Sequence, residues 1–337
     1  MPADRTNVNQ PSTGWEESID PGEDQRHQQF SELIGGIQQR VDRRHGPGRA
    51  FHRKQIAGLA ATFEVLDDLP DYARHGLFAA SSRHDALVRM SNGGITPQSD
   101  VMPDIRGLAI SVRDVDGPGA LGGTTDRQDF LLINRPAFGF RDSRDFAEIV
   151  PLAARGQTAL VKGLVAAHGV VGGAKAAGSL SKDLARWFTG YATSTFYTAA
   201  PLSWGPYAAK VRIVPRQSGF SPRAQLDWAA DVNRRVTSQP IIFDVEAQFF
   251  VDEGRTPIED GRQPWPESVA GWLPVAVLTI PVQDPLSAEG IELAARIEGG
   301  AFDPWAALAE HRPLGEIMRA RKPAYFASQR QRHAASD

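Results

Sequence analysis

One tyrosine near the C-terminus stands between two arginines at spacings that suit metal ligation. Tyr325 follows Arg321 by four residues and precedes Arg332 by seven. Residues four apart on a helix lie side by side, so the Arg321 guanidinium would lie beside the phenol. A nearby cation favours the charged phenolate, a hard anionic ligand for ferric iron and a known axial ligand of haem. The alternative is a basic, solvated tail with one aromatic side chain packed beneath it.

A second group of chemically capable residues lies far upstream, around the first predicted strands. His52 comes three residues after Arg49, immediately before a strand-like run. In the next run, the alternation of side chains sends Arg89 and Ser91 to the same face. A lone histidine among the eight of this chain would favour a surface role, but His52 is at the mouth of a predicted barrel.

The elements that must position these residues form two groups of strands separated by helices. Strand-like runs cover 58–66, 86–91, 107–112 and 129–133, and later 208–214, 241–251 and 275–282. Helical patterns lie between the two groups and after the second. This order predicts an α+β fold with an antiparallel β-barrel core and surrounding helices. We expect a loose N-terminal arm over 1–20 and a single domain over 21–337.

Composition limits the classes of function. The hydrophobic content of 41% and charged content of 23% are ordinary for a soluble globular protein, and the net charge of −3 gives no general reason to expect nucleic acid. The absence of cysteine excludes disulfides, thiolate ligands, iron–sulfur clusters and a cysteine nucleophile. No apolar run approaches the roughly 20 residues that span a bilayer, and residues 1–17 lack a signal-peptide hydrophobic region. We therefore expect a cytoplasmic location without stable membrane insertion.

Four short motifs, in the same order along the chain, resemble the catalase family. They are Arg-x-x-His (Arg49 and His52), Val-Arg-aromatic-Ser with methionine at the aromatic position (Val88-Arg89-Met90-Ser91), Asp-x-Arg-Gly-x-Ala (Asp104 to Ala109), and Arg-x-x-x-Tyr with a second arginine seven residues later (Arg321, Tyr325, Arg332). The family's aromatic-Glu-Val at the end of the first strand is matched by Phe63-Glu64-Val65. The resemblance implies a haem b cofactor buried between the barrel and the helices.

The resemblance also implies a role for each matching residue. Tyr325 would ligate the iron, with Arg321 holding it as a phenolate. His52 would move the proton of a bound hydroperoxide, and Ser91 would fix its imidazole. The side chains expected to pair with the haem propionates are Arg49, Arg89 and Arg332. Phe138 and Phe140 are candidates for the phenylalanine that packs on the haem face.

Two features depart from the family pattern. The family carries a distal asparagine in Gly-Asn-Asn-Thr-Pro before an apolar strand, and counting back from Leu131-Leu132-Ile133 places Asp126 there, with Thr125 one step away. Without that asparagine we expect inefficient dismutation of hydrogen peroxide. The chain also ends twelve residues after Tyr325, where full-length catalases continue into wrapping and helical segments.

Both departures predict an oxidoreductase of the haem peroxidase kind, using hydrogen peroxide or organic hydroperoxides to oxidise organic donors, with weak catalase activity. Arg53 and Lys54 at the predicted rim would attract a carboxylate substrate such as a fatty-acid hydroperoxide. The alternatives are a fatty-acid hydroperoxide isomerase or dehydratase of the allene-oxide-synthase kind, a non-enzymatic haem carrier or sensor, and a haem-free lipid-binding barrel. The expected partners are the peroxide, a small organic or lipid substrate and further copies of the chain, with a dimer favoured.

Overall fold

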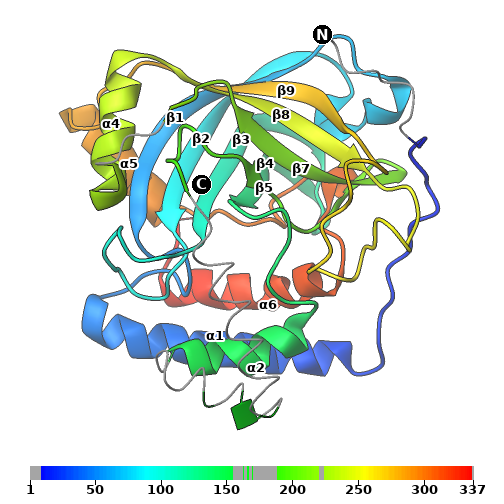
Figure 1. The fold of residues 1–337 in the computed structure, drawn as a ribbon, viewed down its shortest axis with the longest axis horizontal. Helices are drawn as coiled ribbons and strands as arrows, with labels where there is room; N and C mark the ends of the chain where they lie inside the picture. The colour runs from blue at the N-terminus through cyan, green and yellow to red at the C-terminus, as the bar shows by residue number, and fades with distance from the viewer. Residues whose placement is uncertain are drawn as a thin grey trace.

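The protein is described from a computed structural model, which covers residues 9–154, 162, 165, 166, 169, 188–219 and 224–335. A β-barrel lies above a layer of helices (Figure 1). The strands are β1 (Gln55–Val65), β2 (Ser82–Asn92), β3 (Arg106–Pro118), β4 (Thr124–Ile133), β5 (Phe196–Tyr197), β6 (Leu202–Trp204), β7 (Tyr207–Pro215), β8 (Ile241–Phe249) and β9 (Trp272–Ile280). The α-helices of the described residues are α1 (Glu23–His45), α2 (Ser143–Ala154), α4 (Trp228–Ser238), α5 (Ala288–Gly299) and α6 (Glu316–Gln331).

The strands pair in the order β5-β4-β3-β2-β1-β9-β8-β7-β6, and every pairing is antiparallel. The short strand β5 closes the barrel because it pairs with β4 on one side and with β7 on the other. Eight strands thus form a ring, and β6 extends it beside β7. The predicted α+β fold with an antiparallel barrel is confirmed.

The strand register brings three positions together at one end of the barrel. Ser91 of β2 is opposite Gly107 of β3, and Gly107 is opposite Ile133 of β4. These pairs lie where β2 and β4 end and β3 begins. The predicted site residues on different strands therefore converge at this end.

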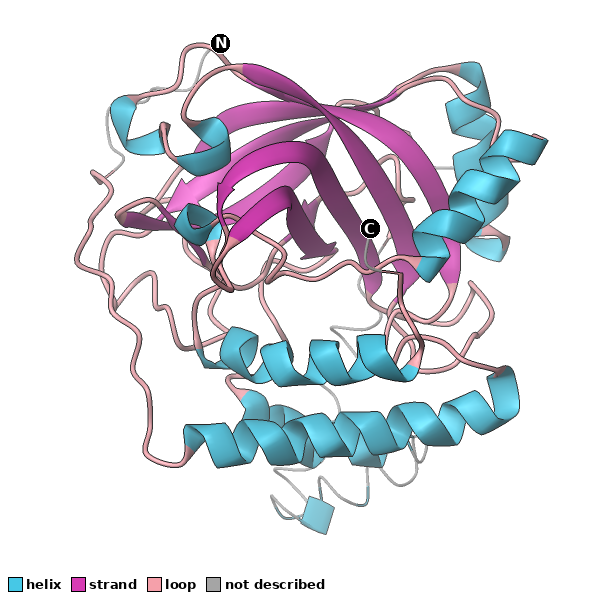
Figure 2. Ribbon diagram, turned by 180° about the vertical axis from the view of Figure 1, so that it is seen from behind, coloured by secondary structure: helices cyan, strands magenta, loops and turns pink. Residues whose placement is uncertain are grey.

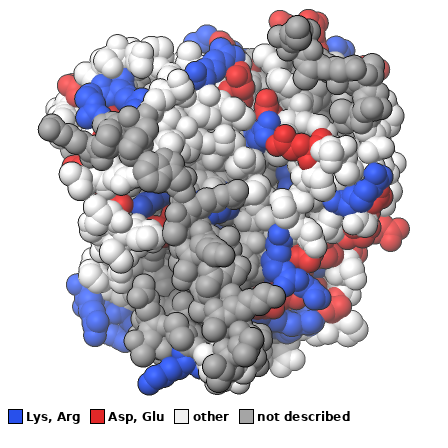
Figure 3. Space-filling view, in the orientation of Figure 1, with Lys and Arg blue, Asp and Glu red and all other residues white. Residues whose placement is uncertain are grey.

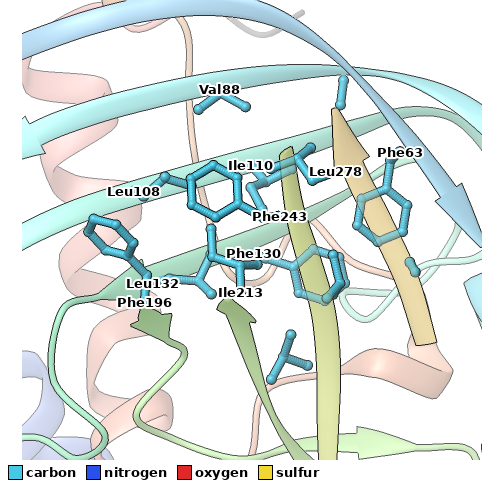
Figure 4. Packing of buried hydrophobic residues seen from close by; sticks show 14 of the residues in the cluster. Phe63, Val88, Leu108, Ile110, Phe130, Leu132, Phe196, Ile213, Phe243 and Leu278 are labelled. Carbon is cyan, nitrogen blue, oxygen red and sulfur yellow. The ribbon is translucent and has the colours of Figure 1, made fainter. Parts of the chain in front are cut away.

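The barrel encloses an apolar core, because side chains alternate between the two faces of each strand and the inward ones are hydrophobic. Figure 4 shows these side chains meeting across the barrel; those labelled are Phe63, Val88, Leu108, Ile110, Phe130, Leu132, Phe196, Ile213, Phe243 and Leu278. Each is at most 2% exposed. Burying a side chain of this size stabilises the fold by about 1.5–3 kcal/mol, so the barrel is a rigid support for the site.

Helices α1, α2 and α6 form the layer beneath the barrel, whereas α4 and α5 lie at its side (Figures 1 and 2). Phe30 and Ile34 lie on the same face of α1 and pack against Ala320 and Ala324 of α6. Gly46, with φ 78°, ends α1 in a conformation that glycine adopts readily. The layer covers the end of the barrel at which the site residues converge.

The N-terminal arm is held more firmly than the sequence predicts. Residues 9–20 run along the side of the molecule to α1 (Figure 1). The Trp15 indole donates a hydrogen bond to the Pro206 carbonyl at 2.9 Å. Glu17 forms ion pairs with Arg312 and Arg319, both at 2.7 Å. These hydrogen-bonding and charged contacts anchor residues 9–20, whereas residues 1–8 of the predicted loose arm lie outside the described residues.

No helix among the described residues combines the length and hydrophobicity needed to cross a membrane. On the face shown in Figure 3, acidic and basic side chains are interspersed rather than gathered into one large basic patch.

Candidate functional site

A cavity of about 330 Å³ lies between the end of the barrel and the helix layer. Its walls are mainly apolar side chains from α1, α2, α6 and the strand ends of β2, β3 and β4. The predicted site residues that line it are Arg49, His52, Arg89, Ser91, Phe138, Phe140, Arg321, Tyr325 and Arg332. Its volume falls in the range of ligand-binding cavities, about 300–1,000 Å³.

The backbone around His52 fixes its ring on the barrel side of the cavity. His52 has a φ of 53°, which is uncommon for a residue with a side chain. Its amide donates to the Gly93 carbonyl at 3.1 Å, and its carbonyl accepts from Arg89 Nη2 at 2.8 Å. Gly107 lies so near that a Cβ there would be 2.5 Å from His52 Nδ1. Only glycine at position 107 leaves space for this ring.

The His52 ring is held neutral and keeps one nitrogen available. Nδ1 is 3.1 Å from Ser91 Oγ, whereas no described residue forms a hydrogen bond with Nε2. Protein surrounds the ring, and the surface it retains faces the cavity. This burial, together with the positive charges of Arg89, Arg321 and Arg49, lowers the pKa of His52 to about 3. At neutral pH the imidazole is therefore uncharged and can accept a proton.

Tyr325 enters the cavity from the helix layer and is paired with Arg321 as the helical spacing predicts. Arg321 Nη2 donates to Tyr325 Oη at 2.5 Å, and the guanidinium also lies 5.0 Å from the centre of the phenol ring. The second described partner of Arg321 is the Met318 thioether, at 3.3 Å from Nη1. A thioether is a weak, uncharged acceptor, so the phenol oxygen is the stronger of the two described hydrogen-bond acceptors of Arg321.

The remaining arginines gather around a single carboxylate. Glu298, at the end of α5, pairs with Arg49 and Arg89, each at 2.8 Å. Arg49 and Arg332 also donate to the Gly300 carbonyl, each at 2.8 Å. Burial and repulsion from Arg89 hold the pKa of Arg49 well below its usual range, and burial lowers the pKa of Arg332. Three guanidinium groups thus share one negative charge, which leaves an excess of positive charge at this edge of the cavity.

These features fit haem. Its two propionates would neutralise the excess charge of the arginines, and bidentate guanidinium groups suit carboxylates. The apolar walls would cover the macrocycle, and the phenol oxygen of Tyr325, which accepts a hydrogen bond from Arg321, is a suitable ligand for ferric iron. The residues present would therefore hold the group that the sequence motifs imply.

Comparisons with solved structures agree with the observed fold. No family model and no curated protein matches the sequence. Among solved structures, a fungal catalase aligns with a TM-score of 0.68 at 16% identity, over 97% of this chain and 66% of the catalase. A bacterial catalase aligns with a TM-score of 0.63 at 16% identity, over 98% of this chain and 64% of the catalase. The chain adopts the catalase fold. It spans about two thirds of the length of these catalases.

The position of the cavity overturns the placement of Asp126. This residue is exposed near the hairpin between β3 and β4, where Thr125 pairs with Gly117, and it does not line the cavity. Counting back from Leu131-Leu132-Ile133 assumed that the cavity lies at the start of β4. In the barrel the cavity lies at the other end of β4, beside Ile133, so Asp126 cannot be the distal residue.

Sequence reasoning missed Asn134, which follows Ile133 directly. Its Oδ1 accepts from the Arg106 amide at 2.9 Å, and it stands in the segment between Ile133 and Phe138, both of which line the cavity. The sequence does contain a pattern that could have identified this residue, because Asn134-Arg135-Pro136 has the Asn-x-Pro of the family motif. Glu298 was missed as well, and no local pattern could have found it, since its role depends on the tertiary contact with the arginines.

Arg53 and Lys54 do not form a charged rim. Arg53 is 7% exposed and pairs with Asp42 at 2.8 Å, and Lys54 pairs with Asp100 at 2.6 Å. Neither lines the cavity. Their charges are used within the fold, so they give no reason to expect a carboxylate substrate.

Proposed function

We propose that the protein is a haem-dependent peroxidase, which uses hydrogen peroxide or organic hydroperoxides to oxidise organic donors. One observation carries the proposal: an uncharged histidine and an arginine-paired tyrosine enter one apolar cavity from opposite layers of the fold. A carrier would need Tyr325 and the arginines, but it has no use for a proton-accepting His52 held by Ser91.

When bound, haem supplies the redox-active iron that cleaves the peroxide O–O bond. His52 Nε2 would take a proton from the hydroperoxide and return it to the oxygen that departs as water or an alcohol. Ser91 holds Nδ1, and this keeps the ring in the orientation that the transfer requires. Arg321 would hold the Tyr325 oxygen that ligates the iron by donating a hydrogen bond to it, and Arg49, Arg89 and Arg332 would pair with the propionates.

The phenylalanine side chains of the cavity favour organic substrates. Phe146 of α2 makes edge-on contacts with Phe30, Phe51 and Phe140, with ring centres 4.9–5.6 Å apart. Phe138 lies under the Arg321 guanidinium, with its ring centre 5.5 Å away. An apolar wall of this kind gains from contact with an aromatic donor or an alkyl hydroperoxide, whereas hydrogen peroxide gains little from it.

A second candidate is catalase activity, and Asn134 favours it. The expectation of weak dismutation depended on the lack of an asparagine near the cavity, and Asn134 supplies one at the margin. The two activities can be separated on the same haem-loaded protein. Donor oxidation is measured with cumene hydroperoxide and a phenolic donor, and dismutation is measured as oxygen release from hydrogen peroxide.

We expect rapid donor oxidation and slow oxygen release, and we expect Asn134→Ala to reduce oxygen release while leaving donor oxidation nearly unchanged. Fast oxygen release without donor oxidation would identify a catalase instead. Conversion of a lipid hydroperoxide to rearranged products without any donor would favour the isomerase.

A further inference from the structure

A second cavity, of about 250 Å³, lies on the outer face of the barrel beside β7 and β8. Its lining is largely aromatic and proline side chains around one lysine; the residues are Pro136, Tyr197, Lys210, Gln248, Pro264, Trp265, Glu267 and Trp272. The Gln248 amide donates to the carbonyls of Trp265, at 3.2 Å, and Ala270, at 2.7 Å. These bonds fix the covering segment to the barrel, so this second cavity is built into the fold.

Lys210 is the chemically distinctive residue of the second cavity. It is 3% exposed, and its Nζ donates to the Gln263 carbonyl at 3.0 Å and lies 5.0 Å from the centre of the Trp265 ring. No carboxylate of the described residues is hydrogen-bonded to it or paired with it. A buried ammonium group without a carboxylate partner is costly, so the neutral amine is favoured.

The negative charges around Lys210 only partly offset the lowering of its pKa by burial. Glu267 is occupied, because it pairs with Arg212 at 2.8 Å and accepts from the Trp272 indole at 3.0 Å. The negative charge of Asp260 acts in favour of the ammonium, but burial outweighs it and lowers the pKa of Lys210 to about 7. An ordinary lysine has a pKa near 10.4, so at neutral pH a far larger fraction of Lys210 is a nucleophilic amine.

We propose that Lys210 binds a small aromatic aldehyde in the second cavity by forming an imine with it. The Nζ lone pair attacks the carbonyl carbon to give a carbinolamine, which loses water, so that amine and aldehyde become imine and water with no change in oxidation state. The aromatic walls of Tyr197, Trp265 and Trp272 would hold a planar ring. This inference does not rest on the proposed haem chemistry.

The second cavity lies behind the wall of the first cavity, which is lined by His52 and Tyr325. Tyr197 lines the second cavity and the next residue, Thr198, lines the first. Likewise Pro136 lines the second cavity and Phe138 lines the first. A bound aldehyde would therefore lie against the same two segments that form one side of the first cavity.

The test is to trap the imine on the full-length protein. Benzaldehyde is added at pH 7, the imine is reduced with borohydride, and the labelled lysines are identified by peptide mass spectrometry. We expect Lys210 to be labelled at least about tenfold faster than Lys322. Lys322 is a matched control, because it also lies over a tryptophan, 4.9 Å from the Trp305 ring centre. Butanal, which lacks a ring, should label Lys210 more slowly.

The wild-type peptide map decides the question even if a variant fails to fold. Equal labelling of Lys210, Lys322 and Lys54, or no label on Lys210, would overturn the proposal. Lys210→Met should remove the fast phase of labelling. Trp272→Leu should retain reaction with Lys210 but reduce the preference for benzaldehyde over butanal, and an unchanged preference would contradict the aromatic specificity.

Discussion

Two enclosed histidines lie at opposite ends of the barrel. His52 precedes the start of β1, and His311 lies against Gly76 and Phe78, which follow the end of β1. Burial lowers the pKa of both rings, to about 3 for His52 and about 4 for His311. In each case a nearby glycine leaves space for the ring, since a Cβ at Gly107 or at Gly76 would lie 2.5 Å from a ring nitrogen.

His52 and His311 differ in their hydrogen-bond partners. His311 Nε2 accepts from the Leu77 amide at 3.0 Å, and Nδ1 lies 3.4 Å from the Ser203 carbonyl. Its ring also packs edge-on against Phe78 and Trp204. His52 has one nitrogen fixed by Ser91, one without a described partner, and a cavity beside it. Burial and a lowered pKa are thus shared by the structural His311 and by His52, for which we propose a catalytic role, and the ring nitrogen of His52 without a described partner distinguishes the two.

Replacing His52 should produce the largest effect. His52→Gln removes the proton acceptor but keeps a polar side chain of similar size, so peroxide turnover should fall by about 10²–10⁴-fold. Haem binding, followed by tryptophan fluorescence quenching, and the melting temperature should change little. Turnover within a factor of two of the parent would place His52 and His311 in the same structural class.

The opposite result is expected for His311→Gln. This change disrupts two buried hydrogen bonds and aromatic packing, so the free energy of unfolding should fall by about 1–3 kcal/mol in denaturant titrations. Turnover per folded molecule should remain at the parent value. A specific loss of turnover without loss of stability would show that His311 takes part in the chemistry.

Lowering the pH should destabilise the folded protein, because the pKa values of both His52 and His311 are lowered. Below about pH 6.5 His52 and His311 become protonated in the unfolded chain but stay neutral in the folded protein. Each histidine should therefore lower the free energy of unfolding by about 1.4 kcal/mol per pH unit. The loss should level off near pH 4 for His311 and pH 3 for His52.

Denaturant titrations of the parent and His311→Gln between pH 7 and 4.5 measure this dependence. The variant should have the shallower slope, and equal slopes would contradict the neutral state of His311. Turnover of the parent should stay nearly constant from pH 8 to 5, since His52 remains uncharged across that range.

The smallest effect is expected for Ser91→Ala. The loss of one hydrogen bond to Nδ1 leaves the ring in place, because the backbone bonds of His52 and the close approach of Gly107 remain. We expect peroxide turnover to fall by about fivefold, which corresponds to the ~1 kcal/mol of a typical hydrogen bond. A loss as large as that of His52→Gln would show that Ser91 itself moves the proton.

Much of the fold and part of the site could be predicted from sequence because those features are local. The four-residue spacing of Arg321 and Tyr325 fixes their contact on a helix, and strand alternation places Arg89 and Ser91 on one cavity wall. The placement of Asp126 failed because it assumed that the cavity lies at the start of β4, whereas the cavity lies at the other end of that strand. Glu298 and Lys210 gain their properties from segments distant in sequence, which no spacing rule reveals.

The proposed function depends on Tyr325 acting as the ligand of a haem iron in the first cavity. The most direct measurement is the visible absorption spectrum of the protein expressed with a haem supply, for the parent and Tyr325→Phe side by side. We predict a high-spin ferric spectrum of the tyrosinate type in the parent, lost or altered in the variant. A colourless parent that stays haem-free when haem is added, or identical spectra for the two proteins, would contradict the account.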